Sequence, residues 1–357
     1  MGVRLVDALP FLIGWTCGWI LFVRVPHLDA GPGTAAAVSP RDAMAVVVPA
    51  RDEAANIARL LASVMPQLRP GDELVVVDDD STDETVAIAS AFGARVVSPP
   101  GPLPPGWTGK CRACQHGADV TSAPTIAFLD ADVALMPGAL DHLAVVAGAA
   151  GGLVSVQPWH RPVRLYEQCS LIFNLAAVMG TGLASPFAEA VRGRVAYGPM
   201  MATTRADYER VGGHAAPSVR GSVVEDIALA RLYEGRVSVG LGRGMAEFRM
   251  YPNGPRQLIE GWRKNIAAGA AAAPWWAVVL MIGWIWSVIG APAAGWPCWA
   301  LSALQLWWFG RRVGRWHPLA YAGGPLLAVL FLVVLTLSVW SRWRGATTWR
   351  GRTVSVR

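Results

Sequence analysis

The sequence predicts an α/β domain with a mostly parallel sheet, flanked at both ends by transmembrane helices. Between residues 39 and 254, short apolar strands alternate with amphipathic helices, which is typical of a parallel sheet covered on both faces. Outside this region lie long segments without a charged side chain. The 357 residues are 53% hydrophobic and 16% charged, and the mean hydropathy of +0.36 is too high for an ordinary soluble protein.

The charge-free segments predict the membrane-spanning part. Ranges 8–23, 265–310 and 316–341 contain no Asp, Glu, Lys or Arg, and a helix needs about 20 apolar residues to cross the hydrocarbon core. We therefore expect an N-terminal anchor at 5–25 and transmembrane segments at 271–341, the first two of which form a hairpin. The Trp-rich stretches "GWIW" and "LWWFG" fit the aromatic belt at a bilayer boundary.

Basic residues predict the orientation of the chain. Arg24, His27 and Arg41 follow the first segment, so the positive-inside rule places the α/β domain on the cytoplasmic side. A cleaved signal peptide is the alternative to an uncleaved anchor. If all three C-terminal segments crossed the membrane, the Arg-rich tail would lie outside, against the same rule, unless one segment is re-entrant.

The net charge of +6 comes almost entirely from arginine, because only Lys110 and Lys264 among the 31 basic residues are lysines. The basic tail, 342–357, predicts a contact with anionic lipid headgroups. Its arginines are Arg342, Arg344, Arg350, Arg352 and Arg357. No surface with interleaved basic and aromatic residues indicates nucleic-acid binding. The C-x2-C of Cys111 and Cys114 has no second pair to complete a zinc site, so we expect reduced thiols.

The elements of the α/β domain follow one another as strand and helix. The strand "AMAVVVPA" precedes a helix, "RDEAANIARLLASVM", whose apolar residues recur at helical spacing. The strand "DELVVVDDD" precedes the helix "DETVAIASAF", and "ARVVS" is a third strand. The helix "GKCRACQHGADV" leads to a fourth strand, "TIAFLDADV". Repeated units of this kind indicate a parallel sheet.

Polar clusters follow three of these strands, as "PARDE", "DDDSTD" and "DAD". Ligands of parallel sheets bind at the carboxyl ends of the strands, so we expect the clusters to converge on one ligand. In a strand, residues two apart share a face, and Asp130 and Asp132 would then point at one divalent cation. The alternative for this pair is a solvated Asp turn. A dinucleotide fold is not indicated, because no G-x-G-x-x-G follows the first strand.

Seven segments in this order resemble the inverting enzymes of glycosyltransferase family 2. They are "VVVPARDEAANIARLLASV", "VVVDDDSTDET", "PPGWTGKCRACQHGA", "FLDADV", "GPMMATTRADYERVGG", "VVEDIALA" and "MYPNGPRQLIEGWRKN". More narrowly, they are similar to the membrane-anchored bacterial enzymes that glycosylate carotenoid acids, of the diaponeurosporenoate type, and to the hopene-associated glycosyltransferases. The resemblance covers about 44–269 and implies a GT-A catalytic domain, at 39–254, that moves a sugar from a nucleoside diphosphate with inversion.

The resemblance also implies roles for residues at the strand ends. The last Asp of the family's D-x-D motif, here Asp132, binds Mg²⁺ or Mn²⁺ with the diphosphate oxygens, and Asp130 lies nearer the ribose. Uridine and ribose are held by residues after the first two strands. These are Pro49, Ala50, Arg51, Glu53 and Asp79. The family usually has Gly where Asp80 stands, so the local turn departs from its pattern.

Lys110 and an acidic pair complete the expected site. A lysine in the first turn of a helix suits a phosphate, although a surface lysine is the alternative. By resemblance, Asp226 is the general base, and its neighbour Glu225 raises the pKa of one member of the pair. If the acceptor is a carboxylic acid, it would be largely ionised already. Asp226 would then orient the acceptor more than remove a proton from it. The alternative for the pair is a charge complement to the helix dipole.

An amphipathic helix at 255–270 precedes the C-terminal segments and suits the bilayer surface. By resemblance, Trp262, Arg263 and Lys264 face the sugar diphosphate. The Q/R-x-x-R-W motif of processive relatives is not matched, which favours transfer of a single sugar. The segment 169–180 is either a second interfacial helix or part of the core.

These observations predict a cytoplasmic-face membrane enzyme that transfers one sugar, glucose from UDP-glucose, to a lipophilic isoprenoid acceptor such as a carotenoid acid. The partners expected are the UDP-sugar, the acceptor and membrane lipids. A transferase acting on polyprenyl phosphate or a glycerolipid is the alternative, and an inactive membrane scaffold is a third. The sequence leaves the acceptor, the choice between Mg²⁺ and Mn²⁺, and the oligomeric state open.

Overall fold

The computed structural model describes residues 5–28, 41–191, 193–343, 346–349 and 352–355. The chain divides into two compact units. We call the first the sheet unit, which comprises His27–Trp159 and Arg192–Arg249. The second, the helical unit, comprises Met1–Pro26, His160–Val191 and Met250–Arg357.

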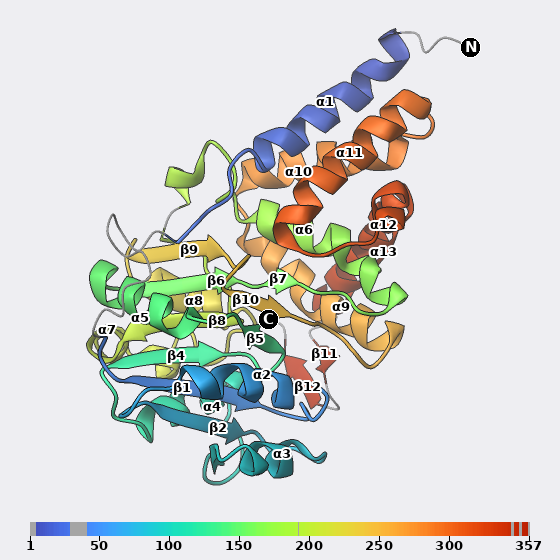
Figure 1. The fold of residues 1–357 in the computed structure, drawn as a ribbon. Coiled ribbons are helices and arrows are strands. Elements are labelled where there is room, and N and C mark those ends of the chain that lie inside the picture. The colour runs from blue at the N-terminus through green and yellow to red at the C-terminus, as the bar shows by residue number, and fades with distance from the viewer. Residues whose placement is uncertain (1–4, 29–40, 192, 344–345, 350–351, 356–357) are drawn as a thin grey trace. The chain divides into compact units, whose positions relative to one another are not determined.

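The sheet unit is built on a seven-stranded sheet in the order β3-β2-β1-β4-β8-β6-β9 (Figure 1). Its strands are β1 (Met44–Ala50), β2 (Glu73–Asp78), β3 (Arg95–Val97), β4 (Thr125–Leu129), β6 (Leu153–Gln157), β8 (Met200–Thr204) and β9 (Val237–Leu241). All neighbouring strands pair in parallel except at β8, which is antiparallel to β4 and β6. The predicted α/β fold with a mostly parallel sheet is therefore confirmed.

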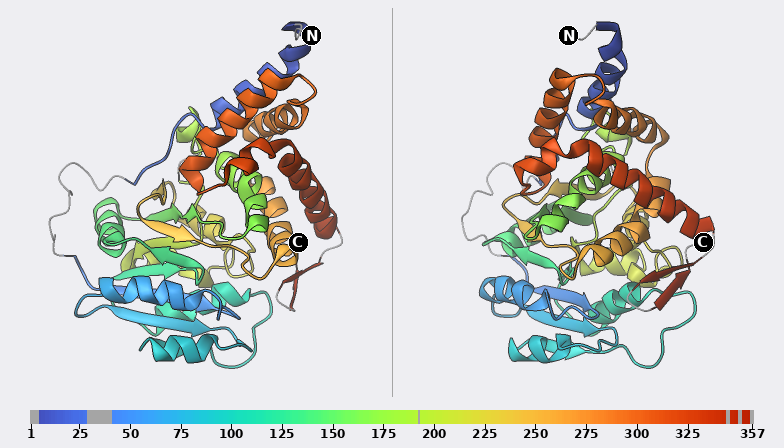
Figure 2. Two further views of the ribbon diagram at one scale, coloured as in Figure 1. Left: turned by 45° about the vertical axis from the view of Figure 1, so that its right-hand side comes forward. Right: turned by 90° about the vertical axis from the view of Figure 1, so that its right-hand side faces the viewer.

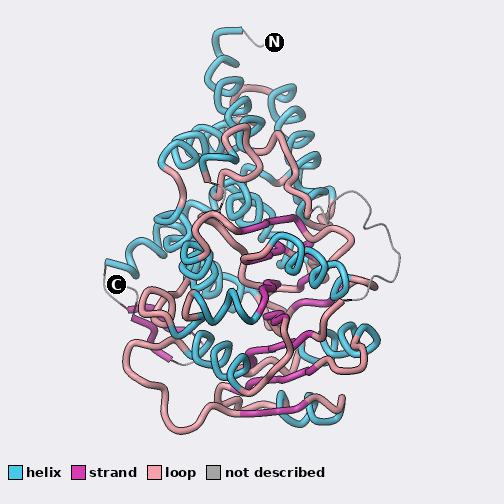
Figure 3. The backbone as a smooth tube through the Cα atoms, turned by 90° about the vertical axis from the view of Figure 1, so that its left-hand side faces the viewer, coloured by secondary structure: helices cyan, strands magenta, loops and turns pink. Residues whose placement is uncertain are grey.

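Helices cover both faces of this sheet, and Figure 3 shows the strands stacked between them. They are α2 (Ile57–Val64), α3 (Thr85–Ala91), α4 (Gly109–Asp119), α5 (Ala139–Ala150), α7 (Arg205–Arg210) and α8 (Glu225–Leu232). The central strands are buried on both faces, as expected for a run of valines. On one face α4 packs closely, because a Cβ at Gly117 would lie 2.2 Å from a methyl carbon of Val47.

Two short strands and a turn complete the sheet unit near its carboxyl edge. β5 (Val133–Leu135) pairs antiparallel with β10 (Ala246–Phe248). The 3-10 helix η4 (Gly213–Ala215) packs against α4. Along the chain, the first segment of the sheet unit ends at Trp159 and the helical unit resumes at His160, the two residues of β7 (Trp159–His160).

The helical unit contains the apolar segments of the chain. Its elements are α1 (Leu5–Leu21), α6 (Ser170–Gly180), α9 (Pro255–Ala272), α10 (Trp275–Gly290), α11 (Trp296–Val313), α12 (Pro318–Ala322), α13 (Gly324–Trp343) and the hairpin of β11 (Ala346–Trp349) and β12 (Arg352–Ser355). Helices α1, α10 and α11 run side by side in Figures 1 and 2. The ring centroids of Trp19 on α1 and Trp308 on α11 are 4.7 Å apart.

Among the described helices, α13 alone is long and apolar enough to cross a membrane by itself, with a mean hydropathy of 2.2 over Gly324–Ser341. α1 and α10 are apolar but shorter, at 17 and 16 residues. The expected hairpin turn is present between α10 and α11. Of the arginines predicted to contact lipid, Arg344, Arg350 and Arg357 lie outside the described residues.

Two predicted interfacial helices pack within the helical unit. α6, which matches the segment at 169–180, is buried along most of its length, so the core alternative holds for it. On α9, Leu258 and Trp262 are buried, whereas Ile259 is 36% exposed. The predicted apolar stripe of α9 therefore serves mainly the packing of this unit.

Candidate active site

Three parallel strands bring the predicted nucleotide-binding residues to one edge of the sheet. Arg51 follows β1, Asp79 follows β2 and Asp130 follows β4. These strands pair in parallel, so their carboxyl ends meet at the same edge. Pro49 lies one residue before the end of β1. The convergence of these polar clusters, expected from the sequence, is present in the structure.

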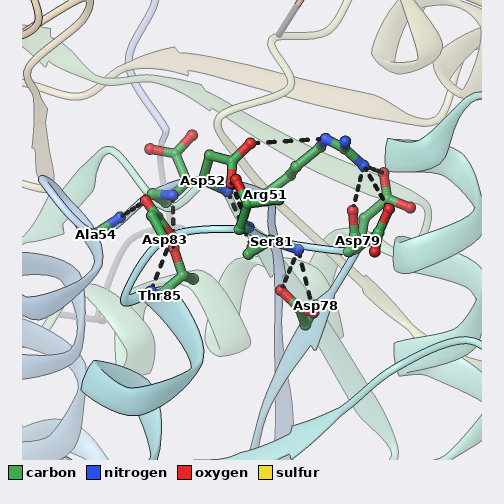
Figure 4. A network of polar contacts seen from close by, with 11 residues as sticks. Arg51, Asp52, Ala54, Asp78, Asp79, Ser81, Asp83 and Thr85 are labelled. Carbon is green, nitrogen blue, oxygen red and sulfur yellow. Dashed lines mark hydrogen bonds and ion pairs between the residues drawn. The ribbon is translucent and has the colours of Figure 1, made fainter. Parts of the chain in front are cut away.

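The loop after β1 is fastened to the loop after β2 (Figure 4). A guanidinium nitrogen of Arg51, Nη1, donates to the main-chain oxygen of Asp79 at 2.6 Å, and Asp79 N donates to Ala50 O at 2.9 Å. Asp52 N donates to Ser81 Oγ at 3.0 Å. Three residues predicted to hold the nucleotide, Ala50, Arg51 and Asp79, therefore form one hydrogen-bonded cluster.

Glu53 is fixed by the same pair of loops. Its N–H donates to Thr85 Oγ1 at 2.7 Å, and the next N–H, of Ala54, donates to Asp83 Oδ2 at 3.0 Å. The Glu53 carboxylate accepts a hydrogen bond from Asn56 Nδ2 at 2.9 Å. The carboxylate of Asp83 also accepts from Thr85 N at 2.9 Å, so it ties the loop after β1 to the start of α3.

Asp79 lies against the first turn of α4. A Cβ at Gly109 would stand 2.0 Å from Asp79 Oδ2, so only glycine lets the helix start so close to this carboxylate. Thr108 caps the helix, with its hydroxyl accepting from Cys111 N at 3.2 Å. The arrangement confirms the predicted helix and places Lys110 in its first turn. Gly109 itself was not singled out from the sequence, although a Gly-Lys step at a helix start was a usable signal.

Asp130 and Asp132 lie in a turn between two strands. β4 ends at Leu129 and β5 begins at Val133, whose N–H donates to Asp130 O at 3.1 Å, as in a β-turn. The prediction that the two carboxylates share the face of one strand is therefore wrong. The chain has to change direction here to pair with β10, and the two residues lie in that turn.

The residues around this turn fit a divalent cation that is bound together with substrate. Asp132 is half-buried, and its main-chain oxygen accepts from Arg249 N at 3.2 Å. Across the described part of the chain, no three His, Cys, Asp or Glu side chains are grouped to hold a metal. Mg²⁺ and Mn²⁺ need no such cage, because they accept one or two carboxylates and complete their shell with water and phosphate oxygens.

Lys110 joins the turn after β4 to the acidic pair of α8. Its Nζ lies 2.7 Å from Asp130 Oδ1 and 2.8 Å from Glu225 Oε1. The Glu225 side chain is only 8% exposed, whereas Lys110 and Asp130 remain about a third exposed. Lys110 is therefore no free surface lysine. The sequence suggested a phosphate partner for it and gave no sign of the contact with Glu225.

Asp226 is held by two main-chain N–H groups. Gly198 N donates to Oδ2 at 2.8 Å, and Ile227 N donates to Oδ1 at 2.9 Å. Burial and the neighbouring charge of Glu225 raise the pKa of Asp226 to about 7, against the opposing effects of Lys110 and the two hydrogen bonds. A carboxyl group with that pKa can exchange a proton near neutral pH, which a general base requires.

Gly198 is a site residue that the sequence did not single out. A Cβ at this position would lie 3.3 Å from Lys110 Nζ and from Glu225 Oε1, and 3.4 Å from Asp226 Oδ2. The missing side chain allows the backbone to approach all three charged groups and to donate to Asp226. The Gly-Pro step just before β8 was the available signal.

The two thiols of α4 take no part in acid–base chemistry. Cys111 and Cys114 are buried, and Cys111 Sγ lies 3.4 Å from Val219 O. Burial raises the pKa of Cys111 to about 12 and that of Cys114 well above its usual value. Thiols of this kind are inert, in agreement with the prediction of reduced cysteines.

The last three predicted residues lie in the helical unit. Trp262 is 6% exposed and donates from Nε1 to Ser170 Oγ at 3.0 Å, and Arg263 Nε donates to Ser341 Oγ at 2.7 Å. Lys264 follows on the same helix. Their contacts within this unit account for the packing of Trp262 and Arg263, and the role in donor binding stays a prediction.

Comparisons with known proteins agree with this geometry. Residues 45–162 match the model of the family "Glycosyl transferase family 2". The 4,4'-diaponeurosporenoate glycosyltransferases of two Staphylococcus aureus strains, MRSA252 and USA300, are each 32% identical, over 95% of this chain and 94% of theirs. A solved structure, the mannosyltransferase PcManGT from Pyrobaculum calidifontis in complex with GDP-Man and Mn²⁺, matches with a TM-score of 0.54 at 17% identity, over 94% of this chain and 96% of that one. The sheet, its carboxyl-edge cluster and the full-length similarity together show that the chain is a glycosyltransferase and belongs to glycosyltransferase family 2.

Proposed function

We propose that this enzyme transfers a single glucose from UDP-glucose to a lipophilic isoprenoid acceptor, a carotenoid acid, at the cytoplasmic face of the membrane. The observation that carries the proposal is the position of Asp226. It is a carboxylate with a pKa of about 7, adjacent to a lysine that reaches the end of β4. The choice of acceptor is supported by the named activity of the relatives that match this chain over nearly its whole length.

The donor would bind along the carboxyl edge of the sheet. Residues after β1 and β2 hold the uridine and ribose, and Asp79 accepts a hydrogen bond from the uracil imide. The proposed donor-binding set of the sheet unit is Pro49, Ala50, Arg51, Glu53, Asp79, Lys110 and Asp130. A divalent cation bound at Asp132 would offset the charge of the departing diphosphate.

The transfer is a single displacement. The acceptor oxygen attacks the anomeric carbon while the bond from that carbon to the diphosphate oxygen breaks, and its electron pair leaves with UDP. The proton of the acceptor passes to Asp226. A carboxylic acid in apolar surroundings keeps its proton to a higher pH than in water, because desolvation disfavours the charged form. Asp226 would then be the base for an acid that binds with its proton, and for an acid that binds ionised it would serve orientation.

The helical unit would hold the enzyme at the membrane. α13 can cross a bilayer by length and composition, and large apolar side chains of this unit are exposed. Trp275, Trp296, Leu326 and Trp343 are among them. Side chains of this kind are stable only against lipid or protein. We therefore propose a multi-pass arrangement in which α1, α10 and α11 insert together with α13, and α9 lies at the interface.

The test follows radiolabelled UDP-glucose in membranes that contain the wild type, Asp226→Asn or Glu209→Gln. Glu209 is a surface carboxylate of α7 that serves as a charge-matched control. With carotenoid acid and Mn²⁺ supplied, we expect label in the lipid extract for the wild type and the control, and a loss of at least ~10²-fold in Asp226→Asn or with a chelator.

Other acceptors decide between the alternatives. Label that moves only onto polyprenyl phosphate or a glycerolipid would replace the proposed acceptor. No transfer from any nucleotide sugar to any of these lipids would contradict the proposal and favour the inactive scaffold.

A further inference from the structure

We infer that Lys110 and Glu225 form an opposed charge pair that tunes the base Asp226, and that Glu225 is a positioning residue that holds Lys110 and not a second base. The inference rests on the proposed function, in which Asp226 removes the acceptor proton. The sequence assigned Lys110 to the donor and Glu225 to catalysis. The geometry links the two residues to each other.

Glu225 is placed to hold Lys110. Its Oε1 lies 2.8 Å from Lys110 Nζ, and the carboxylate is only 8% exposed. A buried carboxylate keeps its charge when a cation is in contact with it. Asp226 differs, because main-chain N–H groups of Gly198 and Ile227 fix its two oxygens. Asp226 is therefore the carboxylate whose orientation does not depend on Lys110.

Lys110 also connects the two sides of the reaction. The same Nζ that reaches Glu225 lies 2.7 Å from Asp130 Oδ1, in the turn after β4. Gly198 leaves room for this junction, because a Cβ there would lie 3.3 Å from both Lys110 Nζ and Glu225 Oε1. The lysine thus sets the distance between the donor-side carboxylate and the acidic pair.

The charges with the largest effect on the pKa of Asp226 are those of Glu225 and Lys110. Glu225 raises its pKa and Lys110 lowers it. Two other titratable groups nearby are uncharged at neutral pH, because burial raises the pKa of Cys111 to about 12 and lowers that of His214 to about 4. Besides Asp226, the ionisable groups that interact with Lys110 and Glu225 include Cys111, Cys114, Asp130 and His214. Removing either charge of the pair should therefore shift the pKa of Asp226, in opposite directions.

The experiment measures kcat/KM for transfer to the acceptor as a function of pH. In the wild type, kcat/KM should rise as pH increases through about 7, because Asp226 must lose its proton to act as base. We call this rise the limb of the pH profile. Lys110→Met removes the positive charge and should move the limb to higher pH by roughly one unit. Glu225→Gln removes the negative charge and should move the limb to lower pH by roughly one unit. The double variant should return it toward the wild-type position.

Controls separate tuning from a general loss of structure. Glu209→Gln changes a surface charge of the same unit and should leave the limb in place. Lys110→Arg keeps the positive charge, so its limb should lie at the wild-type pH, whatever the maximum value of kcat/KM in this variant. Thermal unfolding of each variant shows that it is folded, and the double variant leaves no buried unpaired charge if either single variant is unstable.

The outcomes distinguish a failure of this inference from a failure of the proposed function. If Glu225→Gln abolishes transfer as fully as Asp226→Asn does, Glu225 is itself catalytic and the inference fails. If both charge removals shift the limb in one direction, or leave it unmoved, the pair does not tune Asp226 and the inference fails while the proposed function stands. An Asp226→Asn enzyme that keeps its full rate would overturn the proposed function, because the pair would then have no base to act on.

Discussion

A single backbone angle accounts for the glycine that the family usually has where Asp80 stands. Asp80 has a φ of +66°, in the left-handed region that glycine adopts freely and other residues adopt at a cost of roughly 1 kcal/mol. Its side chain is 80% exposed and 3.8 Å from Arg51, a separation at which a surface ion pair contributes little. The turn is therefore present without the expected glycine, and it is strained.

We predict that Asp80→Gly raises the free energy of unfolding by at most about 0.5 kcal/mol. The gain is the relieved strain less the extra entropy of glycine in the unfolded chain. Thermal unfolding of the purified protein measures it. Glu84→Gly is the matched control, since Glu84 has a φ of −76° and glycine there should only destabilise. Equal losses in both variants would show that the Asp80 side chain stabilises the turn.

Contacts between residues far apart in the sequence could not be predicted from the sequence. The nucleotide-binding loops were predictable because each follows its own strand, and parallel pairing brings them to one edge. The contact of Lys110 with Glu225 was not, because it depends on where α8 packs against α4. The burial of the Trp262 indole beside Ser170, within the helical unit, was not predictable either, and its expected role at the donor stays a prediction. The local sequence pattern predicts which face of a helix or strand a residue occupies. It does not predict which residue from another element that side chain will contact.

Among the elements, α1 shows a packing motif that the sequence analysis did not use. Gly14 and Gly18 are four residues apart, and both face α10. A Cβ at Gly14 would lie 2.2 Å from Gly283 O, and one at Gly18 would lie 2.4 Å from Trp284 Cδ1. Small residues at this spacing let two helices pack closely in a membrane. This close packing ties α1 to α10, and the choice between an uncleaved anchor and a cleaved signal peptide stays a prediction.

We predict that Gly14→Ala separates α1 from α10 and lowers the stability of the detergent-solubilised enzyme by roughly 1–3 kcal/mol. The new methyl would collide with main-chain atoms, which cannot move aside as a side chain can. Gly290→Ala is the control on α10, because nothing lies within 4 Å of its Cβ position. Thermal unfolding compares the two variants, and indistinguishable transitions would mean that α1 is held by other contacts.

At the largest scale, the directions of the helices in the helical unit predict on which side of the proposed membrane arrangement the basic tail lies. The ends of the helices in the helical unit can be matched. Phe11, near the start of α1, lies in one cluster with Cys298, near the start of α11. At the other ends, the rings of Phe22 and Phe309 are 5.1 Å apart. α1 and α11 thus run in the same direction, and both end on the side of Arg24.

α12 then turns back along α11, and in the proposed membrane arrangement this would remove the conflict with the positive-inside rule. Trp299 Nε1, near the start of α11, donates to Ala322 O at 2.9 Å, so α13 begins beside the first half of α11. α13 ends beside α9, where Ser341 Oγ accepts from Arg263 Nε at 2.7 Å. α9 runs directly into α10, whose first turn lies close to the end of α1, since Trp276 packs against Gly182 and Arg24 N donates to Ala184 O. The chain therefore leaves α13 on the side of Arg24.

We predict that an epitope appended after Arg357 and one inserted between Pro26 and His27 share a side of the membrane, and that one in the α10–α11 turn at Ala294 lies on the other. In sealed inside-out vesicles, added protease should remove the first two and spare the third, and right-side-out vesicles should give the reverse. Retained UDP-glucose transfer would show that each tagged protein is folded. A C-terminal epitope that is protected together with the turn epitope would mean that α12 and α13 complete a further crossing. The helix ends and the positive-inside rule both favour the first outcome, because only then do Arg24 and the arginines of the tail face the same anionic surface.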